Sequence, residues 1–167
     1  MKNNTAKKSS GAKLGAIGSQ FGALCWRMHR GHVEVLLITS RDTGRWIIPK
    51  GWPIEGRSPA NAAAQEAWEE AGVRGKVAET ALGLYDYDKI RTPKAALPCA
   101  VTVFPLRVKE LADKFPERRE RRRKWFPARK AARKVAEPEL RALLEAIGED
   151  ASLVQGTPSE SPTVDGA

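Results

Sequence analysis

Short runs of apolar residues in the first third of the chain predict β-strands. Residues 21–28 (FGALCWRM) and 33–40 (VEVLLITS) are aliphatic and aromatic, and the turn HRGH separates them. A second turn, RDTG, leads into the apolar run RWIIP. That run ends at Pro49, because proline has no backbone donor for a strand ladder. Three strands are therefore predicted before residue 50.

The pattern then becomes helical. Ser58 is a good N-cap and Pro59 suits the first position of a helix. The following segment, ANAAAQEAWEEA, has high helix propensity, and Gly72 supplies a C-terminal stop. These signals predict one helix over residues 59–71.

Strands and one more helix are predicted in the second half of the chain. Residues 73–90 predict one or two strands, and residues 98–110 (PCAVTVFPLRVKE) predict another. A basic stretch and the run WFPARKAARKV follow. The apolar stripe of the last helix consists of Leu140, Leu143, Leu144 and Ile147. Because strands outnumber helices and do not alternate regularly with them, the predicted fold class is α+β, with a mixed sheet between helices.

The two ends of the chain are more polar than the middle. Residues 1–18 and 148–167 are predicted to be disordered tails, which leaves one domain over residues 19–147. Cys25 and Cys99 have neither metal-site nor disulfide-framework spacing, which favours reduced thiols. No apolar run approaches the roughly 18 residues of a membrane span, and no secretory signal pattern is visible. We expect a cytoplasmic protein.

The net charge of +9 and the pI of about 9.8 favour a polyanionic partner. Nucleic acid, a nucleotide, an inositol polyphosphate or an anionic membrane surface would fit, and a solvated basic surface without a ligand is the alternative. Ten Lys or Arg residues lie between residues 117 and 134. Trp125 and Phe126, inside this run, are expected to anchor it in the core.

Three glutamates stand out in this basic chain. Glu66, Glu69 and Glu70 share one face of the predicted helix, because residues at i, i+3 and i+4 are neighbours. They also lie near its C-terminus, where the helix dipole disfavours anions. A hard divalent cation such as Mg²⁺ would turn their repulsion into attraction and keep waters for a substrate phosphate. A solvated acidic face is the competing interpretation.

The same stretch resembles the Nudix box, G-x5-E-x7-R-E-U-x-E-E-x-G-U, in which U is aliphatic. The matching positions are Gly51, Glu66, Glu69, Glu70, Gly72 and Val73, and the departures are Arg57, Gln65 and Ala67. The flanking runs TSRDTGRWIIPKGW and ERRERRRKWFPARKAARKV resemble the diphosphoinositol polyphosphate phosphohydrolase branch, and PKGW is also similar to diadenosine polyphosphate hydrolases. The resemblance covers residues 20–145 and implies a Nudix α/β/α sandwich.

The resemblance also implies hydrolysis of a phosphoanhydride with Mg²⁺ or Mn²⁺. Glu66 and Glu70 would be metal ligands, with Glu69 in the same cluster and the backbone of Gly51 approaching the ion. Glu69 would take the proton of the attacking water, and Glu66 is the alternative for that role. In the family an Arg orients the first metal-binding Glu, and here Gln65 could donate only an uncharged hydrogen bond.

Substrate contacts follow from the same comparison. Arg41, Arg91 and Arg121 would line the pocket, Lys50 would add a cation beside the metal, and Trp52 would stack a base or pack. Gln20 and Glu137 stand where that branch has basic contacts. The expected substrate is a diphosphoinositol polyphosphate, a dinucleoside polyphosphate or a substituted nucleoside diphosphate. Two alternatives are a catalytically weak module that binds RNA or another polyanion through residues 118–134, and an enzyme acting on RNA 5′ ends.

Overall fold

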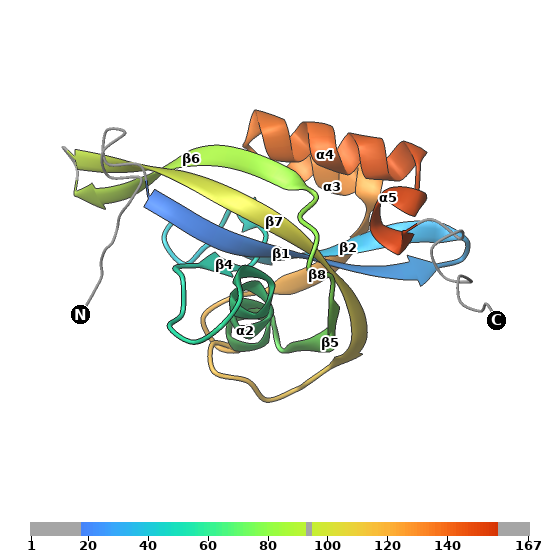
Figure 1. Cartoon of the computed structure of the whole chain (residues 1–167), viewed down its shortest axis with the longest axis horizontal. Helices are drawn as coiled ribbons and strands as arrows, with labels where there is room; N and C mark the ends of the chain where they lie inside the picture. Colours follow the sequence, from blue (N-terminus) through green and yellow to red (C-terminus); the bar gives the residue numbers. More distant parts are fainter. Residues whose placement is uncertain (1–17, 93–94, 157–167) are drawn as a thin grey trace.

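The computed structural model describes residues 18–92 and 95–156, and Figure 1 shows how their elements are arranged. The strands are β1 (Gly18–His29), β2 (His32–Thr39), β3 (Trp46–Ile47), β4 (Lys50–Gly51), β5 (Val73–Val77), β6 (Gly83–Thr92), β7 (Ala95–Leu111) and β8 (Arg123–Pro127). The helices are α2 (Pro59–Ala71), α3 (Ala128–Lys134), α4 (Pro138–Glu149) and α5 (Ser152–Gln155).

All eight strands belong to one mixed sheet. Its main path runs β3-β2-β1-β7-β5, with β4 paired to β1, β6 to β7 and β8 to β2. The long β1–β7 pair is parallel, and the other pairs are antiparallel. Helix α2 covers one face of the sheet, and α3 and α4 cover the other (Figure 1). The predicted α+β sandwich is confirmed.

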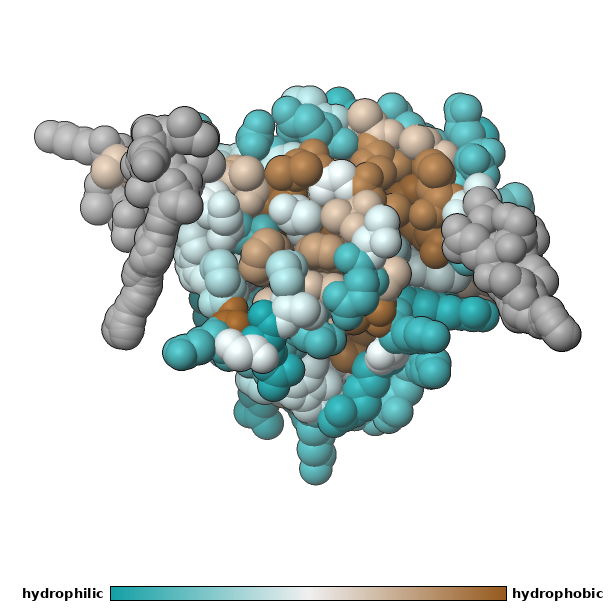
Figure 2. All heavy atoms as spheres, in the orientation of Figure 1, coloured by the Kyte–Doolittle hydropathy of each residue, from teal (hydrophilic) through white to brown (hydrophobic). Residues whose placement is uncertain are grey.

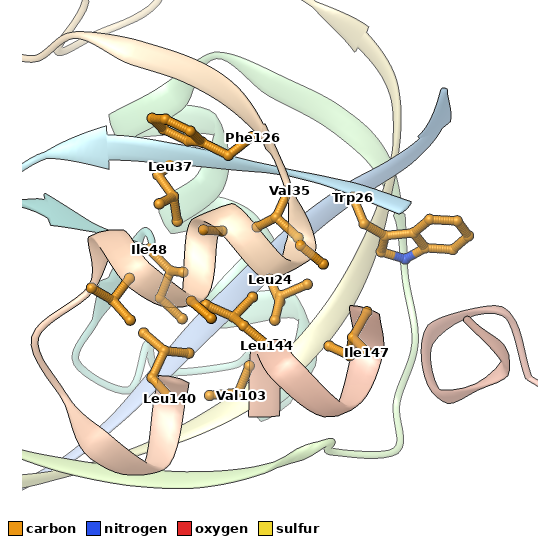
Figure 3. Close-up of a cluster of buried hydrophobic side chains, with 14 of the residues drawn as sticks. Leu24, Trp26, Val35, Leu37, Ile48, Val103, Phe126, Leu140, Leu144 and Ile147 are labelled. Atoms are coloured by element: carbon orange, nitrogen blue, oxygen red, sulfur yellow. The ribbon is translucent and has the colours of Figure 1, made fainter. Parts of the chain in front are cut away.

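Alternation along β1 builds a separate core on each face of the sheet. Leu24 faces α3 and α4, whereas Ala23 and Cys25 face α2. Figure 3 shows the first of these cores, where Leu140 and Leu144 of α4 point toward side chains of the sheet. Both cysteines are free and buried, and burial raises the pKa of the Cys25 thiol. This agrees with the expected reduced, unreactive state.

Helix α2 begins and ends as its sequence predicts. The Ser58 hydroxyl accepts a hydrogen bond from the backbone N of Asn61 at 3.1 Å, and Pro59 occupies the first turn. Gly72 ends the helix in the left-handed conformation, with φ of 69°, which favours glycine. The face against the sheet consists of Ala60, Ala63, Ala67 and Ala71. These small side chains allow α2 to lie close to the strands, so its polar face remains available for a site.

The predicted C-terminal boundary is too early. Helix α4 continues to Glu149, and the short helix α5 follows, with Val154 8% exposed. Ser152 donates both its backbone N–H and its hydroxyl to Asp150, which starts α5. Ala151 and Val154 pack against the core of α3 and α4, although the composition of this segment suggested a tail. The predictions for residues 1–17 and 157–167 lie outside the described residues. No helix within the described part is long and apolar enough to cross a membrane.

Candidate active site

Glu66 and Glu70 meet on the side of α2 that faces β4. They are four positions apart, so their side chains differ by only about 40° around the helix axis. Glu70 is buried and accepts a hydrogen bond from the backbone N of Lys50 at 3.3 Å. The Glu66 carboxyl group lies so close to Gly51 that a Cβ there would overlap it. Strand β4 therefore brings its backbone directly against the pair.

The pKa values of both carboxyl groups are raised. Burial raises the pKa of Glu70 from 4.5 to about 8, and the charge of Arg121 opposes this rise. Burial also raises the pKa of Glu66, and the two groups are close enough to share a proton. Glu66 is half-buried and Glu70 is buried, and two carboxylates this close ionise together most readily with a compensating cation. Hard divalent cations prefer such oxygen ligands, so the pair fits Mg²⁺ or Mn²⁺.

Glu69 does not join this pair. It lies about 100° from Glu70 around the helix axis, and its Oε2 accepts a 2.7 Å hydrogen bond from Nε2 of Gln65. Among the described residues, no three acidic, His or Cys side chains converge as a ready-made metal cluster. Glu69 thus faces Gln65 in this structure, and its expected place at the metal stays a prediction. Gln65 donates its uncharged hydrogen bond to Glu69.

Arg121 reaches the carboxylate pair from the segment after β7. Its side chain is 8% exposed, and its Nη2 lies 3.8 Å from Oε2 of Glu70. Its Nε donates to Glu117 at 2.8 Å and its Nη1 to the backbone O of Thr39 at 3.1 Å. The guanidinium is thus fixed beside the pair, as the sequence comparison predicted for a substrate contact.

Glu117 is a site residue that the sequence analysis missed. Besides binding Arg121 by its side chain, it donates its backbone N–H to the backbone O of Glu69 at 3.0 Å. The pKa of Glu66 depends most on burial, then on its hydrogen bond to Glu70 and on the charge of Glu69. The charge of Glu117 also raises this pKa. The signal was its position four residues before Arg121. Glu117 was not selected because the surrounding run consists mainly of basic residues.

A cavity of about 350 Å³ opens next to Arg121. Its lining consists of Thr39, Ser40, Arg41, Gly44, Arg119, Glu120, Arg121 and Arg122. Arg41, which was predicted to bind substrate, is exposed there and pairs with Glu120 at 3.0 Å. Arg119 and Arg122 also line it, although no sequence pattern distinguishes them from the rest of the basic run. Four guanidinium groups in one cavity attract a phosphate chain.

The other predicted substrate residues are placed differently. The backbone of Lys50 touches Glu70, but its ammonium lies 4.7 Å from the ring centroid of Tyr87. Tyr87 packs against the core of the α3 and α4 face, while the charge of Lys50 is still close enough to act on Glu70. The expected cation beside the metal stays a prediction. Trp52 is 41% exposed and packs near Gly18. Arg91 lies in β6, and its side chain is outside the described part.

A NUDIX domain model matches residues 18–147. The chain is 31% identical over 105 residues to Nudix hydrolase 12, mitochondrial, of Arabidopsis thaliana, which covers 59% of this chain and 50% of that protein. It is 34% identical over 105 residues to diphosphoinositol polyphosphate phosphohydrolase 3-alpha of Mus musculus, which covers 62% of this chain and 60% of that protein. These matches span half to three-fifths of the relatives' length.

The likeness of fold extends further than the likeness of sequence. A solved structure of a C. elegans Ap4A hydrolase binary complex matches with a TM-score of 0.63 and 20% identity. The match covers 81% of this chain and 98% of that one. The NUDIX domain of Shewanella oneidensis NrtR, solved with ADP ribose, matches with a TM-score of 0.61 at 15% identity, over 86% of this chain and 94% of that one. These two comparisons show a shared fold.

Proposed function

This chain belongs to the NUDIX domain family, and from that premise we propose that it hydrolyses a phosphoanhydride bond in a highly anionic diphosphate or polyphosphate compound. The observation that carries the proposal is the pair of half-buried Glu66 and buried Glu70, held against Gly51 with Arg121 beside it. The similarity to a diphosphoinositol polyphosphate phosphohydrolase and the fold of an Ap4A hydrolase support this class of substrate.

Glu66, Glu70 and the backbone at Gly51 would hold Mg²⁺ or Mn²⁺. The residues fit such an ion because two carboxyl groups lie side by side and because glycine leaves room for the Glu66 carboxyl group. When bound, the ion would neutralise phosphate charge and lower the pKa of a bound water.

Arg121 would bind the phosphate next to the scissile bond. Its contacts with Glu117 and Thr39 hold the guanidinium in place before substrate arrives, so little reorganisation is needed when charge develops. Arg41, Arg119 and Arg122 line the neighbouring cavity and would bind phosphates further along the substrate. This arrangement favours substrates with several consecutive or clustered phosphates.

We propose that Glu69 accepts the proton of the attacking water. Its carboxylate accepts a hydrogen bond from Gln65, which fixes its rotamer without adding positive charge beside it. A carboxylate positioned as a general base raises the rate roughly 10²–10⁴-fold. Replacement by the isosteric glutamine removes the proton acceptor and leaves the Gln65 contact possible.

A screen for released product tests the proposal. Diphosphoinositol polyphosphates, diadenosine polyphosphates, nucleotide sugars and dNTPs are offered with Mg²⁺, Mn²⁺ or EDTA. The wild type and an exposed control, Glu145→Gln, should hydrolyse at least one class only with metal. Glu69→Gln should lower kcat by about 100-fold or more with KM nearly unchanged. Equal turnover by Glu69→Gln and the wild type would refute the role of Glu69, and no turnover of any class would refute the hydrolase.

A polyanion-binding module is the second candidate, and one observation favours it. Most of the Lys and Arg residues in the segment 118–134 are exposed, namely Arg118, Arg119, Arg122, Lys124, Arg129, Lys130, Arg133 and Lys134. Such a surface gives salt-dependent affinity for RNA. It predicts RNA binding that Glu69→Gln and EDTA leave unchanged. Metal-dependent turnover that Glu69→Gln abolishes identifies the hydrolase, whatever the affinity for RNA.

A further inference from the structure

The segment between β7 and β8 holds the C-terminal end of α2. The backbone N of Glu117 donates to the backbone O of Glu69 at 3.0 Å, and the backbone N of Ala112 donates to the backbone O of Gly72 at 2.9 Å. The last carbonyl groups of a helix have no partner within the helix. Two acceptors at this end are therefore bound by backbone donors of one segment.

A third acceptor is bound by a side chain. Nη1 of Arg123, the first residue of β8, donates to the backbone O of Ala71 at 2.7 Å. The guanidinium lies over the ring of Phe115, 4.9 Å from the ring centroid. Gly72 makes room for both groups, because a Cβ on this glycine would overlap the Phe115 ring and contact Arg123. Arg123 is half-buried, and the proposed reaction does not use it directly.

The charge of Arg123 complements this end of the helix. Helix α2, all of whose residues are described, has no basic residue in its last turn. The helix macrodipole is negative there and disfavours the carboxylates of Glu69 and Glu70. Burial lowers the pKa of Arg123 and the charge of Asp113 opposes this shift, but a guanidinium remains charged at neutral pH. Arg123 thus supplies from β8 the cation that the end of α2 lacks.

The same segment carries Arg121, which is held independently. Arg121 donates to the side chain of Glu117 and to the backbone O of Thr39 in β2. Loss of the Arg123 contact would leave Arg121 attached to the sheet, whereas the end of α2 would lose one of its three attachments. Glu69 lies on this last turn, so its placement relative to Arg121 depends on Arg123.

A small displacement of a reacting group has a large kinetic effect, and a shift of about 1 Å can lower a rate about 100-fold. We propose that Arg123 is a positioning residue, which holds the last turn of α2 against β8 and keeps Glu69 in register with a phosphate bound at Arg121. This inference rests on the proposed phosphoanhydride hydrolysis and on the role of Glu69 in it. A contact that served stability alone would leave the kinetics of the folded protein unchanged.

Steady-state kinetics of the full chain test this role, at saturating Mg²⁺ and below the onset of unfolding, with the substrate that the wild type hydrolyses fastest. Arg123→Gln should lower kcat about tenfold or more, with KM within about threefold of the wild type. Phe115→Leu keeps the guanidinium but removes the ring beneath it, so its kcat should fall about threefold or more. The control Lys114→Gln, which removes an exposed cation of the same segment, should match the wild type.

A double-mutant cycle and amide exchange separate positioning from stability. In the Glu69→Gln background, Arg123→Gln should lower kcat by less than about threefold, because the group that it positions is gone. In the metal-free protein, NMR should show that the backbone amides of Glu117 and Ala112 exchange about tenfold faster or more in Arg123→Gln. The amide of Ala62, which donates to the backbone O of Ser58 in the first turn of α2, should keep its wild-type rate.

The outcomes separate this inference from the proposed function. An unchanged kcat in Arg123→Gln, a change confined to KM, or an equal fall of kcat in the Glu69→Gln background overturns the positioning role while hydrolysis itself stands. If Arg123→Gln does not fold, an unchanged kcat in Phe115→Leu overturns it instead. If the wild type hydrolyses no substrate, the hydrolase fails and so does a role of Arg123 in its reaction. The exchange rates then decide whether Arg123 holds the end of α2, and equal rates overturn that contact as well.

Discussion

Replacing Glu70 by glutamine should stabilise the metal-free protein at neutral pH and abolish hydrolysis. Glu70 is 8% exposed, and its burial makes the charged form unfavourable in the fold. Glutamine has nearly the same shape, carries no charge and can still accept the hydrogen bond from the backbone N of Lys50. The site would lose a metal ligand, whereas the fold would lose a source of repulsion.

The size of the effect follows from the pKa of Glu70. One pKa unit corresponds to about 1.4 kcal/mol. The pKa of this carboxyl group rises from 4.5 to about 8 on folding. Its contribution to the free energy of unfolding is therefore fully present below pH 4.5 and is lost as the pH rises toward 8. About 3 kcal/mol is lost by pH 7. Because the pKa of about 8 already includes the attraction to Arg121, we expect a net gain of about 3 kcal/mol and a Tm higher by roughly 6–12 °C.

Scanning calorimetry in EDTA at pH 5 and pH 8 measures this directly. The Tm of the wild type should fall between these pH values by more than that of Glu70→Gln, and Mg²⁺ at pH 8 should raise the Tm of the wild type but not that of Glu70→Gln. The exposed control Glu145→Gln should follow the wild type throughout. If Glu70→Gln melts below the wild type at pH 8 in EDTA, the repulsion inferred for the pair is absent.

Three further substitutions test other parts of the site and the fold. Gly51→Ala places a methyl group on the carboxyl group of Glu66, so kcat should fall by about 100-fold or more; unchanged kinetics would show that the backbone does not need to approach there. Arg121→Lys keeps the charge but loses the guanidinium fork, so KM should rise at least tenfold, and a KM equal to the wild type would remove Arg121 from substrate binding. Leu144→Ala opens a cavity in the fully buried α4 face and should cost about 2–5 kcal/mol in urea unfolding, with less than 1 kcal/mol indicating that α4 packs loosely.

Local signals explain what could be predicted from the sequence. The start and end of α2 depend on Ser58, Pro59 and Gly72, which act within one helical turn. The strands of the first hairpin follow from runs of apolar residues that need no distant partner to be recognised. Glu66 and Glu70 were identified because helical spacing alone brings them together.

The remaining features depend on contacts between distant segments. Periodicity shows that two residues share a helix face but gives no rotamer, so the pairing of Glu69 with Gln65 was missed. Glu117 enters the site only because its segment packs on the end of α2. Glu137 is paired with Arg45, which lies 92 positions away in the chain. Such register and packing are not encoded in any short motif.

The central claim is that Glu66 and Glu70 hold a divalent cation against a phosphate chain. Crystals soaked with Mn²⁺ and a non-hydrolysable polyphosphate analogue, measured at the manganese absorption edge, test it most directly. We predict an anomalous peak bound by both carboxylates beside Gly51, with analogue phosphate between the ion and Arg121. Ordered analogue with no manganese at this pair, or with both side chains turned to solvent, would contradict the account.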